Sequence, residues 1–277
     1  MTRQPLAHLD LVSLFAACPE PPLDVAALAL SHEFQPGLDT AEVMATLDDW
    51  GGVLAERVAG LSRPADLAAA VGTYLYDELG FQGDEESYYD PRNSFLDQVM
   101  ARRRGIPITL AVLVMSLARR AGVEAEGIGF PGHFLVRMGG RDGVFVDPFF
   151  GARVLDRFQL ERLTERMVGP KASLREEHLT AVGARLTVIR MLRNLARIYD
   201  QMGDHGRGML IADRLADLAG ALDFVRDRGL HALALGAHAA AAEDLSRYLD
   251  GRPAARDADA VREALAKARA GSPRTLQ

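Results

Sequence analysis

The sequence predicts an α+β protein over residues 1–160, followed by an all-helical module over residues 161–277. Three observations support this class. Apolar residues recur at helical spacing through the first 90 residues, the spacing changes to an alternation of two after Gly122, and helical spacing returns after residue 160. A chain of 277 residues can bury two cores. We therefore expect two domains, with the α+β core at about 91–160.

The N-terminal helices have recognisable boundaries. Asp39 and the Arg63–Pro64 pair are typical helix starts, and Gly60 and Gly80 are typical stops. A polar, turn-rich stretch, "QGDEESYYDPRNS", predicts a loop before the core.

Two helices should open the core. "NSFLDQVMARRRG" predicts a helix capped by Asn93 and Ser94 and closed by Gly105. "IPITLAVLVMSLARRAG" predicts a second helix with Pro107 in its first turn. It is apolar on nearly every side until Arg119, so we expect it to be buried.

The stretch "FPGHFLVRMGGRDGVFVDPFFG" predicts an antiparallel hairpin. Folding it about Gly140 places His133 opposite Asp147 on one face, with an apolar strip on the other. We expect the imidazole and the carboxylate to form a hydrogen bond. An imidazole held by a carboxylate is the arrangement that prepares a general base for a nucleophile.

The order "GIPITLAVLVMSLARRAGV", "GHFLVRM" and "VFVDPFFG" resembles the transglutaminase-like (papain-like) core. That motif has a cysteine opening a helix, a histidine on one strand, and an aspartate followed by proline on the next. With "NSFLDQVMARRRGIP" upstream and helical repeats downstream, residues of about 40–255 resemble an uncharacterised bacterial family. Members of that family combine this core with tetratricopeptide repeats, and the family is annotated beside an invasion regulator.

The resemblance matches the histidine to His133 and the aspartate to Asp147, but it aligns the cysteine with Pro107. Proline has neither a nucleophile nor an amide proton. The one cysteine, Cys18, lies in a separate N-terminal helix, where we expect it to be buried. Thr109 is the best local substitute, although a hydroxyl needs strong activation by a base.

Ligand contacts are expected at the same cleft. The candidate ligand-binding residues are Arg103, Asn93 and Pro107, with Arg103 as the contact for an acidic group. One arginine of the "RRR" run could instead form a salt bridge with Asp90 or Asp97. No metal or cofactor is expected, because the histidines of the helical tail lack metal-site spacing to carboxylates; they should lie on the surface: His178, His205, His231 and His238.

The tail contains an internal repeat. Residues 194–215 align with residues 227–248 at an offset of 33, which superposes Gly203 on Gly236 and Ala196 on Gly229. This period and the small residues at the helix crossing resemble tetratricopeptide repeats. Two units are too few to stand alone, so we expect them to pack on the α+β core.

Composition limits the partners. The formal net charge of -6 argues against nucleic acid, and no apolar run is long enough to suggest a membrane span. A single cysteine fits a reducing compartment, and we expect a cytoplasmic protein with a protein or peptide partner. The oligomeric state stays open.

The leading interpretation is a non-catalytic transglutaminase-fold adaptor or regulator. One alternative is a hydrolase or amidase that uses Thr109, His133 and Asp147. Another is a binder of a peptide or small acidic ligand in the remnant cleft.

Overall fold

The computed structural model describes residues 10–271, which form two compact units. The first unit extends to Val188 and the second begins at Ile189. This division lies within helix α8 (Ala184–Met202), later in the chain than the expected boundary at residue 160. The two units are described separately below.

The first unit begins with helices α1 (Leu11–Ala17), α2 (Leu23–Phe34), α3 (Thr40–Val58) and α4 (Pro64–Gly72), followed by a π-helical turn at Thr73–Glu78. The predicted starts are confirmed. The Asp39 side chain accepts hydrogen bonds from the amides that open α3, and Pro64 is the first residue of α4. Gly60 and Gly80 both have positive φ, as helix stops require.

Cys18 is exposed, so the expectation of a buried thiol is wrong. Helix α1 buries Leu11, Leu14 and Phe15 on one face. Cys18 lies at the C-terminal cap in an extended conformation, beyond that face. The apolar pattern of the helix therefore does not extend to it.

The helix expected at 93–105 is shorter than predicted. Residues Pro91–Ser94 form a 3₁₀ turn, and α5 follows at Leu96–Arg102. Arg103, with φ of 59°, ends α5 in place of Gly105. Gly105 belongs to a two-residue parallel ladder, β1 (Gln82–Gly83) with β2 (Arg104–Gly105).

The capping prediction at this helix is also wrong. Phe95 is the N-cap residue of α5 and provides no side-chain hydrogen bond, while Asp90 caps the preceding 3₁₀ turn. Asn93 and Ser94 are instead fully buried within that turn.

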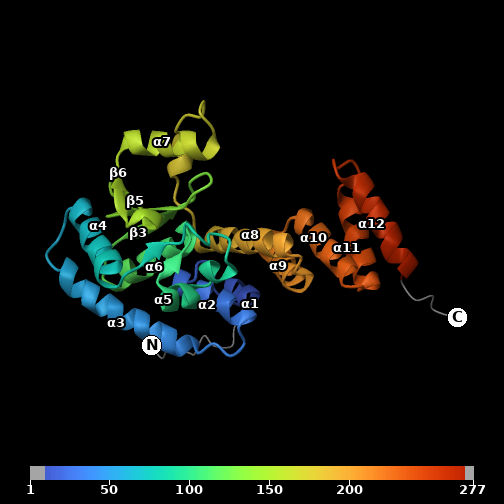
Figure 1. The fold of residues 1–277 in the computed structure, drawn as a ribbon, viewed down its shortest axis with the longest axis horizontal. Coiled ribbons are helices and arrows are strands. Elements are labelled where there is room, and N and C mark those ends of the chain that lie inside the picture. The colour runs from blue at the N-terminus through green and yellow to red at the C-terminus, as the bar shows by residue number, and fades with distance from the viewer. Residues whose placement is uncertain (1–9, 272–277) are drawn as a thin grey trace. The chain divides into compact units, whose positions relative to one another are not determined.

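Helix α6 (Pro107–Arg120) is the buried centre of the unit, as expected. A four-stranded antiparallel sheet follows in the order β3 (Ala125–Ile128), β4 (Leu135–Met138), β5 (Val144–Asp147) and β6 (Arg153–Leu155). The sheet lies between α6 and helix α7 (Arg157–Val168) (Figure 1). The α7 face is closed by one apolar cluster, made of Ile128, Phe130, Leu135, Leu155, Leu160 and Leu163.

The second unit is an all-helical stack. After α8 come α9 (His205–Ala219), α10 (Leu222–Ala234), α11 (His238–Gly251) and α12 (Ala258–Gly271). Helices α9 and α11 begin 33 residues apart, and the glycines that precede them, Gly203 and Gly236, both have positive φ. The predicted offset is therefore confirmed in the helices.

Small residues matter where the helices of this stack cross. A Cβ at Gly229 would lie 2.9 Å from the Cβ of Asp244, so only glycine allows α10 and α11 to approach this closely. Within residues 10–271, no helix offers an apolar stretch long enough to cross a bilayer.

Candidate functional site

His133 and Asp147 form the predicted hydrogen bond. The Nε2 atom of His133 lies 2.9 Å from Oδ1 and 3.0 Å from Oδ2 of Asp147. The two residues are 5% and 2% exposed. An ionised carboxylate only accepts hydrogen bonds, so the imidazole proton is on Nε2 and the ring orientation is fixed.

The register that joins them differs from the predicted one. Arg137 pairs with Phe145 and Val136 with Val146, so the hairpin is centred on Arg141 and not on Gly140. The shift amounts to two residues along the partner strand. Side chains alternate with a period of two, so this shift keeps His133 and Asp147 on the same face.

Asp147 has a second partner. Its Oδ1 accepts a hydrogen bond from the Phe149 amide at 3.0 Å and so caps the 3₁₀ turn Pro148–Phe150. The Tyr76 hydroxyl donates to the Pro148 carbonyl at 2.5 Å from the π-helical turn. Burial, together with the charge of Asp147, raises the pKa of Tyr76. Asp147 of the pair thus caps a turn that the Tyr76 hydroxyl also holds in place.

A buried proline lies where the resemblance aligns the family's cysteine. Pro107 is the first residue of α6, and Thr109 follows two residues later with no exposed surface. The Thr109 Oγ1 has no hydrogen-bond partner among the described residues. The Gly105 carbonyl, four residues earlier, accepts the Asp84 amide at 3.0 Å. The structure therefore does not connect Thr109 to His133.

Asn93 lies in a buried polar network. Its amide group donates to Asp84 Oδ2 at 3.1 Å and to the Ser87 carbonyl at 2.8 Å. Its Oδ1 accepts from Arg102 Nη1 at 2.9 Å. The Nη2 atom of Arg102 also lies 3.8 Å from Oδ2 of Asp90. The sequence suggested such a salt bridge between one arginine of the "RRR" run and Asp90 or Asp97.

Asp84 is the charged centre of this network. Burial favours its neutral form, but hydrogen bonds from Ser87 and Asn93 and the nearby Arg102 and Arg104 outweigh that effect. Together they hold the pKa of Asp84 below its ordinary value.

Arg103 packs against aromatic rings. Its guanidinium carbon lies 4.4 Å from the Trp50 ring centroid and 4.8 Å from that of Phe81. Burial lowers the pKa of Arg103, partly offset by Tyr74. Its Nη1 is buried and has no hydrogen-bond partner within residues 10–271. That Arg103 contacts an acidic ligand stays a prediction.

A cavity of about 500 Å³ adjoins Asp147. Arg153 of β6 and Arg162 and Arg166 of α7 line it. Sequence reasoning missed these three arginines because β6 was not predicted and α7 was assigned to the helical module. The pairing of Asp147 with Arg153 across β5 and β6 is what brings them together.

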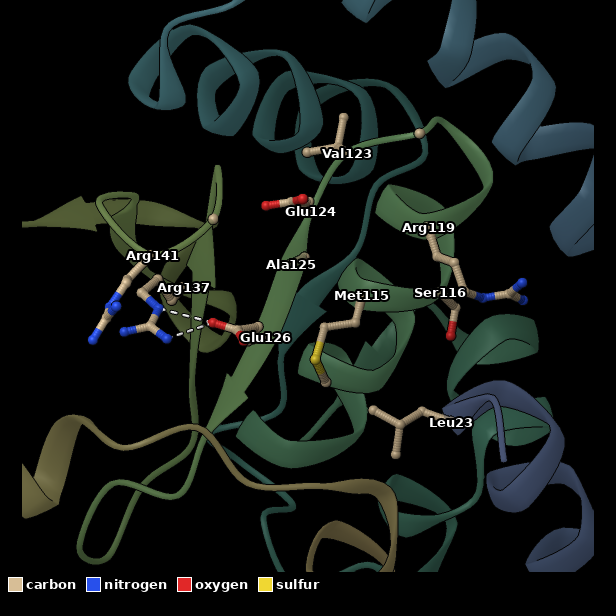
Figure 2. Close-up of a pocket in the computed structure, with 12 residues that line it drawn as sticks. Leu23, Met115, Ser116, Arg119, Val123, Glu124, Ala125, Glu126, Arg137 and Arg141 are labelled. Atoms are coloured by element: carbon tan, nitrogen blue, oxygen red, sulfur yellow. Dashed lines mark hydrogen bonds and ion pairs between the residues drawn. The ribbon is translucent and has the colours of Figure 1, made fainter. Parts of the chain in front are cut away.

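A second cavity of about 770 Å³ lies along β3, and neither His133 nor Asp147 lines it. Figure 2 shows Leu23 and Met115 on one side and Glu126, joined to Arg137, on the other.

The tail histidines are not all on the surface. His178 is buried and meets the Phe130 ring edge-on at 6.2 Å, so that expectation is wrong for it. The reason is that residues 176–182 pack back onto the sheet, where Val182 donates to the Gly127 carbonyl. Within residues 10–271, no three His, Cys, Asp or Glu side chains are grouped as metal ligands would be.

A buried helix, a small antiparallel sheet and a histidine–aspartate pair on adjacent strands define the transglutaminase-like class. The family model described as "Transglutaminase-like superfamily" matches residues 41–193. The chain is 39% identical over 246 residues to a UPF0162 protein of Xylella fastidiosa (strain 9a5c), covering 87% of this chain and 88% of the relative. The chain therefore belongs to the UPF0162 family of transglutaminase-like proteins.

More distant relatives cover less of the chain. A UPF0162 protein of Vibrio cholerae serotype O1 is 33% identical over 188 residues, covering 65% of this chain and 67% of that protein. F-box only protein 21 of Homo sapiens is 33% identical over 157 residues, covering 53% of this chain and 24% of that protein. No solved structure matched the chain significantly.

Proposed function

We propose that this protein is a non-catalytic transglutaminase-fold adaptor, in which a tetratricopeptide-like helical stack and the remnant cleft bind a protein partner. The observation that carries the proposal is Pro107 at the first position of α6, where the resemblance aligns the nucleophilic cysteine. A proline there supplies neither a nucleophile nor a backbone N–H. The His133–Asp147 pair is then a structural hydrogen bond.

The alternative hydrolase needs Thr109 as its nucleophile. A threonine is activated when its hydroxyl donates to a base within hydrogen-bond reach. Within residues 10–271 the Thr109 hydroxyl has no hydrogen-bond partner and therefore no base that could activate it, which supports the adaptor over the hydrolase.

We predict that Thr109→Val raises the free energy of unfolding by up to about 1 kcal/mol, because it removes a buried hydroxyl that forms no hydrogen bond to any residue that the structure describes. Urea denaturation followed by the fluorescence of Trp50, the single tryptophan, measures this. The control is Thr164→Val, which removes a buried hydroxyl that donates to the Leu160 carbonyl and should destabilise by about 1 kcal/mol. Amide or ester turnover that Thr109→Val and His133→Ala both abolish would establish the hydrolase and end the adaptor proposal.

We also predict that a thiol-directed electrophile modifies the native protein only at Cys18, the single cysteine, at the rate of an ordinary exposed thiol. Mass spectrometry after iodoacetamide treatment measures the rate. The same rate in His133→Ala is expected. A rate that depends on His133 would show that this thiol is activated by the pair.

The adaptor role is tested by capture with the full chain. Proteins retained by the tagged chain should be displaced by excess untagged chain and retained equally by Thr109→Val. A retained protein that is chemically processed by the wild type but not by Thr109→Val would contradict the proposal.

A further inference from the structure

The cavity beside Asp147 has two cationic side chains without an opposite charge. Arg162 is compensated by Glu165 at 2.7 Å, and Asp147 is buried and hydrogen-bonded to His133. Arg153 and Arg166 are exposed, and within residues 10–271 neither forms an ion pair. The cavity of about 500 Å³ is therefore positively charged where it opens to solvent.

The floor of this cavity is apolar, and exposed aromatic rings lie close to its arginines in the structure or in the sequence. Leu155 and Leu163 are buried beneath the arginines. Arg166 lies 5.7 Å above the ring of Phe150, which is 39% exposed. Phe158, 68% exposed, is four residues before Arg162 on α7 and so lies on the same side of that helix. An occupant thus meets both guanidinium groups and apolar surface.

A row of aromatic rings leads from Phe150 through the buried Phe149 to a second exposed ring. The ring of Phe150 contacts Phe149 at 5.2 Å, Phe149 contacts Tyr88 at 6.0 Å, and Tyr88 contacts Tyr89 at 5.3 Å. Tyr89, at the far end, is 52% exposed. A small inorganic anion would use the arginines alone. A peptide would use the arginines and the rings together.

We propose that the cavity binds a peptide segment of a partner protein, with an Asp or Glu side chain held by Arg153 and Arg166 and apolar side chains on Phe150 and Phe158. Guanidinium groups bind carboxylates through paired hydrogen bonds, and the buried apolar floor excludes competing water. This inference rests on the proposed function and specifies the chemistry of the partner. The remnant of the catalytic site then supports one wall of a peptide site.

The test uses the full chain and a random hexapeptide library. Peptides retained by the wild type should be enriched in Asp or Glu together with Phe, Leu or Ile. The best retained peptide, labelled with fluorescein, should bind the variant Arg153→Gln/Arg166→Gln about tenfold more weakly. The matched control is Arg157→Gln/Arg175→Gln, which removes the same charge from exposed arginines outside the cavity and should bind normally.

Melting curves of both double variants should match the wild type, because none of the four arginines is buried. Retention without acidic enrichment, or equal binding by both double variants, would overturn the inference. Calorimetric binding of inorganic phosphate that only Arg153→Gln/Arg166→Gln loses, without peptide enrichment, would assign the cavity to a small anion instead. Failure of the proposed function is recognised separately, by turnover that depends on Thr109.

Discussion

Asp147→Ala is expected to lower the free energy of unfolding of the first unit by about 3–4 kcal/mol. The substitution removes the acceptor of two groups at once, the His133 ring and the Phe149 amide. The Nε2–H of His133 and the Phe149 amide both lose this acceptor while they stay buried, and the cost of desolvating those donors adds to the lost hydrogen bonds. Trp50 fluorescence in urea reports this unit, because Trp50 is the single tryptophan and lies in α3.

Two variants separate the causes. Asp147→Asn keeps one oxygen that can accept from both the Phe149 amide and His133 Nε2, but it loses the charge and replaces the second acceptor by an NH2 donor, so we expect a smaller cost of about 1–2 kcal/mol. Asp156→Ala removes an exposed helix cap on α7, which typically costs about 1 kcal/mol. If Asp147→Ala costs no more than Asp156→Ala, the buried pair contributes little to stability, and a structural role for it is wrong.

The sequence determined which hairpin residues share a face, but not which residues are paired. The alternation in "HFLVRM" and "GVFVDPF" specifies only which side chains lie on which face of the sheet. That shared face is what brings His133 and Asp147 together. The register depends on the turn, where Gly139 and Gly140 both have positive φ. Neighbouring glycines allow several turn geometries, so the sequence leaves the register open.

Other misses share a tertiary cause. Gly105 is a better helix stop than Arg103 by local preference. Arg103 nevertheless adopts φ of 59°, with its guanidinium over Trp50 and Phe81, which are more than 20 residues away in sequence. Similarly, β6 has only three residues and one buried side chain. Its alternation is therefore too short to predict a strand from the sequence. The arginine cavity depends on β6 and was missed with it.

Asn93 shows the same limit for a single side chain. Asparagine before a helical segment usually indicates a cap. Here its amide instead joins Asp84, Ser87 and Arg102, and only the ladder between β1 and β2 brings those groups around it. No pattern in the local sequence distinguishes these two roles.

Asn93→Asp should therefore be severe, with an expected loss of about 3–5 kcal/mol at pH 7. The new carboxylate cannot donate to the Ser87 carbonyl, and it lies beside Asp84 at the position where the amide nitrogen is now 3.1 Å away. Arg102 then has two buried carboxylates to compensate. The control is Asn194→Asp, which adds the same charge at an exposed position and should change stability by less than about 0.5 kcal/mol.

The pH dependence of Asn93→Asp has a definite sign. Repulsion from Asp84 raises the folded pKa of the new carboxyl above its unfolded value of about 3.9, so the folded state binds more protons between the two values. Stability relative to wild type should thus recover as the pH falls from 7 through the folded pKa. Asp84 in the wild type acts oppositely: its lowered pKa gives stability that is lost only as the pH falls below about 3.9 and through its folded value. Urea denaturation of both proteins at pH 7, 6 and 5 measures the difference, and a loss of equal size at all three values would mean that Asn93 contributes packing and not charge balance.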